Sequence, residues 1–115
     1  MLPTFEDLLA ALPPLPPTYS AATDFDWALH PGGPAILANA ERALSLTRQH
    51  LRASYDVYVN RGNSGSATIY SVLDRLRCME ADTSSDRGGL REYVVACAFG
   101  PGVAVEMCIL RRRAP

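Results

Sequence analysis

The chain has 115 residues and a formal net charge of -1; 48% of its residues are apolar and 20% are charged. This composition is typical of one soluble domain, and the chain is neither basic nor acidic enough to suggest a partner such as nucleic acid. No apolar run approaches the roughly 20 residues of a membrane span, and the N-terminus lacks the basic flank of a signal peptide. We therefore expect a cytoplasmic protein without a membrane partner.

The N-terminal 24 residues are expected to form a helix and a connector. Apolar residues at helical spacing predict an amphipathic helix over residues 3–12, with Thr4 as its N-cap. The proline-rich run 13–17 ends this helix, because proline lacks the N–H that a helix requires. A PxxP ligand for another protein is the alternative, but a stiff connector is favoured. Residues 25–115 then form the main domain.

A short apolar stretch ending in His30 opens that domain. Alternating β-favouring residues predict a strand over 25–30, and the following Pro-Gly-Gly sequence predicts a tight loop. Pro34 suits the first turn of a helix over 34–46, whose apolar face is predicted to be Ile36, Ala40, Ala43 and Leu44. His30 at the strand's end is the favoured place for chemistry, since α/β sheets carry their working residues there.

Two further helical segments follow. The region 47–58 is expected to be helical and to break at Gly62 and Asn63, with His50 on an exposed, solvated face. Residues 66–79 carry apolar side chains at helical spacing, which predicts a well-buried helix.

The C-terminal region contains two apolar runs rich in β-branched residues. Residues 93–98 and 103–110 predict a central antiparallel hairpin, and the strand over 25–30 is expected to complete a small mixed sheet. The fold class is therefore α/β. The arginines at 111–113 are predicted to be a solvated end to the last strand, with contact to an anionic phosphate or nucleic acid as the alternative.

The three cysteines form neither a CxxC pair nor a cluster with histidine, so no metal site is predicted. Cys78, Cys97 and Cys108 are expected to be buried, reduced thiols. A hairpin centred near Pro101 would place Cys97 opposite roughly Val105, and this register argues against a disulfide between Cys97 and Cys108.

Three glycine-containing motifs follow one another along the chain, at residues 30–34, 62–67 and 99–102. Together they resemble the C-terminal part of type III polyketide synthases, the chalcone and stilbene synthase family, from about Phe25 to Arg112. His30 and Asn63 lie 33 positions apart (63 − 30), which suits that family. The resemblance implies a partial thiolase-like half-domain, with residues 25–115 as a domain similar to the family's C-terminal domain.

The resemblance also implies an activity, the condensation of acyl-CoA starters with malonyl-CoA by a Cys-His-Asn triad. His30 and Asn63 would be its catalytic histidine and asparagine. An imidazole can hold a cysteine as thiolate, and imidazole and amide N–H groups can donate to a thioester oxygen as charge develops there. Without the resemblance, a polar group closing a strand and a residue in a turn would be sufficient explanations for these two positions.

Further positions match the family's loop for the pantetheine arm of coenzyme A and the wall of its cyclisation pocket. By resemblance the substrate-binding residues are Gly32, Gly33, Ala35, Gly65, Phe99 and Pro101. Acyl-CoA and malonyl-CoA would be substrates, and no other cofactor is implied. Ala98 and Gly65 replace residues common in the family, so starter and product length are not transferred.

The family's nucleophilic cysteine has no counterpart here, because Cys78 falls at a helix end and Cys97 and Cys108 fall in apolar strands. Burial of such thiols disfavours the thiolate. We therefore predict that the chain alone is inactive and requires a Cys-bearing half. The alternative is a noncatalytic chain that associates with a synthase. An unpaired strand edge also predicts a homo-oligomer or association with a synthase chain. A stand-alone phosphate binder is disfavoured, because neither glycine loop has a P-loop lysine.

Overall fold

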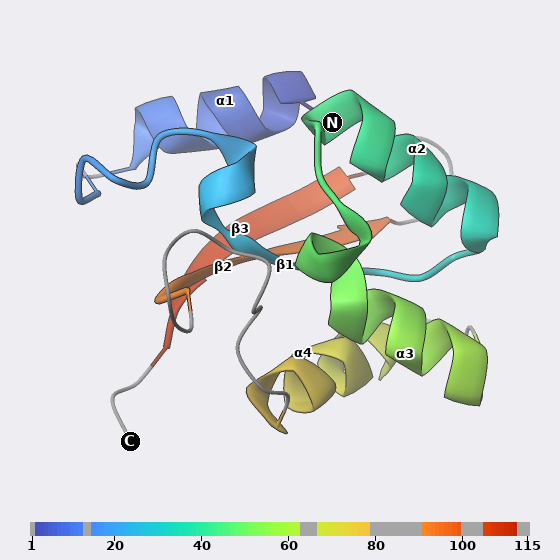
Figure 1. Ribbon diagram of the computed structural model, residues 1–115. Coiled ribbons are helices and arrows are strands. Elements are labelled where there is room, and N and C mark those ends of the chain that lie inside the picture. Colours follow the sequence, from blue (N-terminus) through green and yellow to red (C-terminus); the bar gives the residue numbers. More distant parts are fainter. Residues whose placement is uncertain (1, 13–14, 63–66, 79–90, 100–104, 113–115) are drawn as a thin grey trace.

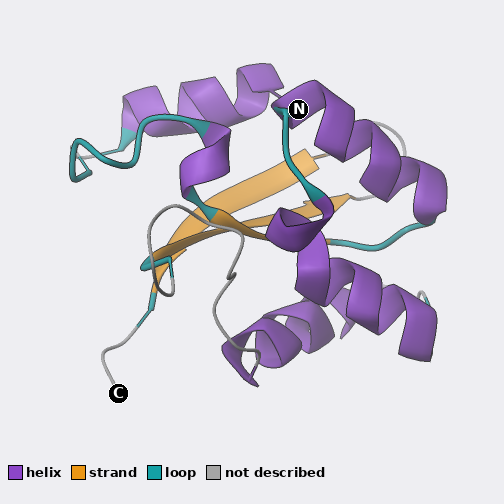
Figure 2. Ribbon diagram, viewed as in Figure 1, coloured by secondary structure: helices purple, strands orange, loops and turns teal. Residues whose placement is uncertain are grey.

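The computed structural model describes residues 2–12, 15–62, 67–78, 91–99 and 105–112 (Figure 1). In chain order the elements are α1 (Leu2–Ala11), η1 (Ala22–Asp24), β1 (Asp26–Leu29), α2 (Pro34–Leu44), η2 (Arg48–Leu51), α3 (Arg52–Arg61), α4 (Thr68–Cys78), β2 (Tyr93–Phe99) and β3 (Val105–Arg111). Figure 2 shows the three strands as one sheet between helices. The predicted α/β class with a small mixed sheet is confirmed.

The sheet has the order β1-β2-β3, with β1 parallel to β2 and β2 antiparallel to β3. Its hairpin register differs from the prediction, because Cys97 lies opposite Met107 and not Val105. The strands pair as far as Phe99 and Val105, so the hairpin is centred one residue later than expected. The three cysteines are nevertheless free, as predicted.

Helices α1 and α2 cover one face of the sheet (Figure 1). Trp27 and Leu29 of β1 and Val95 of β2 point into this side, where they pack in a core cluster with Phe5 of α1. The buried residues of α2 are Leu37, Ala40 and Leu44. The predicted stripe was partly wrong, since Ile36 and Ala43 are exposed. Helix α2 also ends at Leu44, before the predicted 46, because Ser45 takes a left-handed φ of 56°.

Helices α3 and α4 lie on the other face (Figure 1). This side has its own core cluster, whose buried members are Ala28, Ala53, Val57, Val72, Leu76, Val94 and Ala96. The alanines allow the helix backbones to approach the sheet closely. The prediction of a well-buried helix holds for only one side of α4: Val72 and Leu76 are buried, whereas Tyr70 is 73% exposed. Helix α3 ends at Arg61, and the next residue, Gly62, has a left-handed φ of 66°, which confirms the predicted break.

Two smaller predictions were wrong. Helix α1 begins at Leu2, so Thr4 lies inside its first turn and is not the N-cap. Of the three cysteines only Cys97 is buried, because Cys108 lies on a face of β3 that no described helix covers and Cys78 is the last residue of α4. No helix in the described part of the chain is long and apolar enough to cross a membrane.

Candidate active site

His30 directly follows β1 and is half-buried. Its backbone N–H donates to the carbonyl oxygen of Cys97 at 2.9 Å, which continues the pairing of β1 with β2 by one residue. Its carbonyl oxygen accepts from the N–H of Gly32 at 2.9 Å, and the intervening Pro31 is buried. The sheet and a tight turn therefore hold the histidine backbone at the carboxyl end of a parallel strand pair.

The loop after His30 differs in crowding from one residue to the next. A Cβ at Gly32 would lie 3.6 Å from Cδ2 of His30 and only 2.7 Å from Cδ1 of Ile36. A Cβ at Gly33 would meet nothing within 4 Å, and the φ of 164° there is extended backbone open to any residue. Ala35 is exposed in the first turn of α2. The fold itself therefore does not require glycine at position 33, and the space beside the backbone is free.

The remaining predicted site residues are only partly described. Phe99 is the last residue of β2, and its backbone pairs with Val105. Because β1 and β2 are parallel, the carboxyl ends of both strands lie at the same end of the sheet, where His30 also lies. Asn63, Gly65 and Pro101 lie outside the described residues. The expected convergence of His30 and Asn63 stays a prediction.

Ser54 was not identified from the sequence, although it contacts the strand that carries His30. It lies in α3, is fully buried, and its Oγ accepts the backbone N–H of Leu29 at 3.0 Å. Leu29 immediately precedes His30. A serine in a polar helical stretch gives no signal for this role, because the contact joins residues 25 positions apart.

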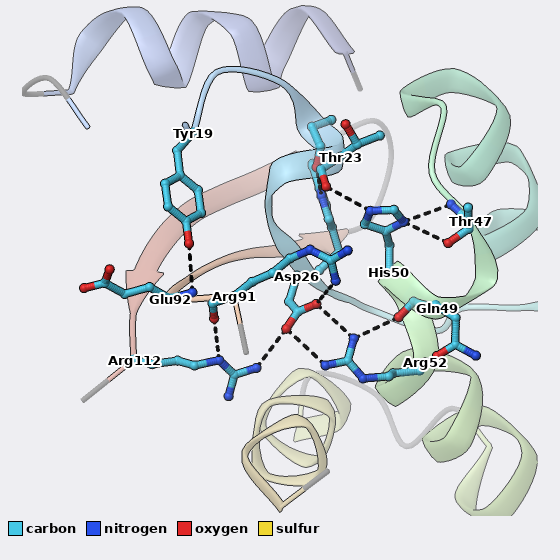
Figure 3. Close-up of polar contacts among 12 residues, drawn as sticks. Tyr19, Thr23, Asp26, Thr47, Gln49, His50, Arg52, Arg91, Glu92 and Arg112 are labelled. Atoms are coloured by element: carbon cyan, nitrogen blue, oxygen red, sulfur yellow. Dashed lines mark hydrogen bonds and ion pairs between the residues drawn. The ribbon is translucent and has the colours of Figure 1, made fainter. Parts of the chain in front are cut away.

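A buried charge cluster surrounds the first residue of β1 (Figure 3). Asp26 is fully buried and accepts hydrogen bonds from Arg52 at 2.9 and 3.1 Å, from Arg91 at 2.8 Å and from Arg112 at 3.0 Å. The prediction of a solvated arginine tail is wrong for Arg112, which turns inward. It holds for Arg111, which is exposed and pairs with Glu92, whereas Arg113 lies outside the described residues.

The protonation of Asp26 follows from two opposing effects. Burial alone would raise the pKa of this carboxyl group. The hydrogen bonds and charge of Arg52, together with hydrogen bonds from Arg91 and Arg112, outweigh burial and lower the pKa below its ordinary value. Asp26 is therefore ionised at neutral pH and links β1 to α3 and to both ends of the β2-β3 segment.

His50 is buried, which corrects the prediction of an exposed, solvated side chain. Its Nδ1 accepts from the backbone N–H of Thr47 at 3.0 Å, and its Nε2 lies 3.0 Å from the carbonyl oxygen of Thr23, to which it donates (Figure 3). This arrangement fixes the neutral Nε2–H tautomer. The ring joins the start of η2 to η1, which is a structural role.

The thiol of Cys97 is unsuited to nucleophilic chemistry. Burial raises the pKa of this thiol to about 11, so it is protonated at neutral pH. Among the described residues, no group of three or more His, Cys, Asp or Glu side chains is placed to hold a metal ion.

The fold is that of the type III polyketide synthases, which have a thiolase-like fold. A type III pentaketide synthase from Neurospora crassa superposes with a TM-score of 0.89 and is 57% identical; the match covers 97% of this chain and 30% of that chain. The structure of CsyB complexed with CoA-SH has a TM-score of 0.78 and 37% identity, covering 95% of this chain and 28% of that one.

Residues 16–113 match the C-terminal domain of chalcone and stilbene synthases. The chain belongs to this family and corresponds to the C-terminal portion of a type III polyketide synthase. The type III polyketide synthase pspB of Penicillium soppii is 56% identical over 90 residues, which are 78% of this chain and 20% of that protein. The chain thus spans about a fifth of the length of this curated relative.

Proposed function

We propose that this chain supplies the His and Asn of a Cys-His-Asn site that condenses acyl-CoA starters with malonyl-CoA. The observation that carries the proposal is the placement of His30 at the carboxyl end of the parallel β1-β2 pair, beside open backbone at Gly33. The cysteine would come from a portion of the synthase that this chain does not cover. Cys97 is excluded from that role by its raised pKa of about 11.

The proposed chemistry uses the His30 imidazole twice. It holds the nucleophilic cysteine as thiolate, and its N–H then donates, together with the amide of Asn63, to the thioester oxygen as negative charge develops during decarboxylation and condensation. The pantetheine arm would pass over Gly32, Gly33 and Ala35. The free space where a Gly33 Cβ would lie supports this path.

The test is complementation. The purified chain is mixed with a separately produced Cys-bearing N-terminal portion of a related synthase, and polyketide formation from acyl-CoA and malonyl-CoA is followed by mass spectrometry. We expect no product from the chain alone, product from the mixture, and a loss of at least about 100-fold with His30→Ala, the scale of losing one oxyanion donor. Gln49→Ala, an exposed truncation, is the control.

Two results would contradict the proposal. One is a mixture that assembles but makes no polyketide. The other is a covalent acyl adduct on Cys78, Cys97 or Cys108 of the chain alone, detected by intact mass and abolished by His30→Ala, because the nucleophile would then be present.

A second candidate function, a noncatalytic chain that associates with a synthase chain, rests on the exposure of β3. In the described part of the chain, β3 pairs on one side only, with β2. Glu106, Cys108 and Leu110 are exposed on the face where α3 and α4 cover β1 and β2. Unpaired edge groups and an uncovered strand face favour association with another chain.

Association is expected to depend on this strand. Leu110→Glu should weaken binding to a synthase chain, or self-association, by at least about tenfold, since it places a charge on a 41% exposed apolar position. Val59→Glu on α3, which is 71% exposed, is the matched control and should change little. Sedimentation at micromolar concentration measures both. A monomer that binds no synthase chain contradicts this function.

A further inference from the structure

The first turn of α3 contacts both ends of β1. Arg52 binds the carboxylate of Asp26, the first residue of the strand, through both of its terminal nitrogens (Figure 3). Ser54, two residues later, accepts the backbone N–H of Leu29, the last residue of the strand. The strand is therefore fixed to α3 at its two ends, and the second contact lies next to His30.

The Ser54 contact satisfies a group that the sheet leaves unpaired. Along a β-strand, the N–H groups of successive residues point to opposite sides, each toward a different neighbouring strand. Because His30 donates to Cys97 of β2, the N–H of Leu29 points to the outer edge of β1. Both Leu29 and Ser54 are fully buried, so the hydroxyl takes the place that a neighbouring strand would take.

The packing around this contact is close. Ala53 of α3 and Ala28 of β1 are both fully buried in the cluster between α3 and the sheet. With side chains this small, α3 lies near enough to β1 for a one-carbon hydroxyl side chain to reach the strand backbone. Removal of the hydroxyl would leave a buried donor one residue before His30, and the strand end would relax to solvate it.

We propose that Ser54 is a positioning residue for His30. Its hydroxyl holds the outer edge of β1 while Cys97 holds the inner edge, and together they fix the point from which the imidazole projects. This inference rests on the proposed function of His30. A small displacement of a reacting group is costly in catalysis, since about 1 Å of misplacement lowers rates by roughly 100-fold.

The experiment compares Ser54→Ala with Ser71→Ala in the full chain by NMR. Ser71 lines the groove between α3 and α4, so it undergoes the same chemical change away from the end of β1. In Ser54→Ala we expect the Leu29 amide to exchange roughly 10 to 100 times faster, the scale of losing one buried hydrogen bond. The His30 imidazole signals should shift, while the core amides of Val72 and Val95 keep their protection.

Further variants assign the His30 signals and replace Ser54→Ala if that variant does not fold. The chain has two histidines, so comparison with His30→Ala identifies the ring signals. Ser54→Cys, with a similar volume and a weak acceptor, is a second variant for the case in which Ser54→Ala does not fold. It should give an intermediate exchange rate and a smaller shift. An unchanged Leu29 amide and unchanged His30 signals in a folded variant would overturn the inference.

Complementation separates this inference from the proposed function. If the wild-type mixture makes no polyketide, the proposed function fails, whereas the NMR comparison still decides whether Ser54 fixes His30. If the wild-type mixture is active, Ser54→Ala should lower kcat by about 10-fold or more with little change in KM. An unchanged kcat would overturn the positioning role while leaving the function of His30 intact.

Discussion

Replacement of Asp26 by asparagine is expected to lower the free energy of unfolding by about 3–5 kcal/mol at pH 7. Asp26 is fully buried and is bound by Arg52, Arg91 and Arg112, whose side chains are 10%, 4% and 18% exposed. An amide cannot balance these charges, so three guanidinium groups would remain close together with little access to water. A domain of this kind has about 5–15 kcal/mol of stability, so the loss is a large fraction.

Urea unfolding at pH 7, followed by circular dichroism, measures this effect. Asp7→Asn is the matched control, because it makes the same chemical change at an exposed position on α1 and should alter stability by less than about 0.5 kcal/mol. If Asp26→Asn unfolds at the same urea concentration as the control, the cluster does not stabilise the fold.

The same cluster predicts how the free energy of unfolding of the domain changes at acid pH. The pKa of Asp26 is lower in the folded chain than its ordinary value of 3.8. Its stabilising contribution is therefore fully present above about pH 4, the unfolded pKa, and is lost as the pH falls through the lower folded pKa. Wild-type stability should decline below about pH 4, and the decline should be shallower in Asp26→Asn. Equal slopes for the two proteins would contradict this assignment.

Replacement of Trp27 by alanine is expected to cost about 3–5 kcal/mol, the usual range for a buried tryptophan. Its side chain is fully buried between the sheet and α1, with its ring 5.4 Å from that of Phe5. Its indole N–H donates to the carbonyl oxygen of Ala22 at 2.8 Å. The substitution removes the packing of α1 on β1 and also one of two hydrogen bonds to that carbonyl oxygen, which still accepts from the N–H of Phe25 at 3.3 Å.

Two further variants separate these contributions. Trp27→Phe keeps an aromatic ring against Phe5 but loses the hydrogen bond to Ala22, so it should cost less than Trp27→Ala. Tyr70→Ala on α4, where the ring is 73% exposed, controls for loss of an aromatic side chain and should cost less than about 0.5 kcal/mol. The midpoint temperatures of thermal unfolding rank the three variants. If Trp27→Ala unfolds at the same temperature as the wild type, the Trp27 side chain does not stabilise the core as predicted.

The sequence by itself determined most of the local structure, and it gave His30 as the predicted place of the chemistry. Apolar spacing identified the helices and strands, and Gly62 identified the end of α3, because these signals act within one or two turns of the chain. The position of His30, after an apolar run and before a loop and Pro34, was sufficient to place it at a strand end. The order of the glycine motifs indicated the family, which residues 16–113 confirm.

The tertiary structure decided which polar side chains are buried. Asp26 meets an arginine 86 positions away, and His50 meets the carbonyl of Thr23, 27 positions earlier. Ser54 reaches Leu29 only because α3 packs against the edge of β1. No local pattern encodes such contacts: each depends on which helix covers which face of the sheet. Whether a polar residue faces water or a partner is settled only when distant segments pack together.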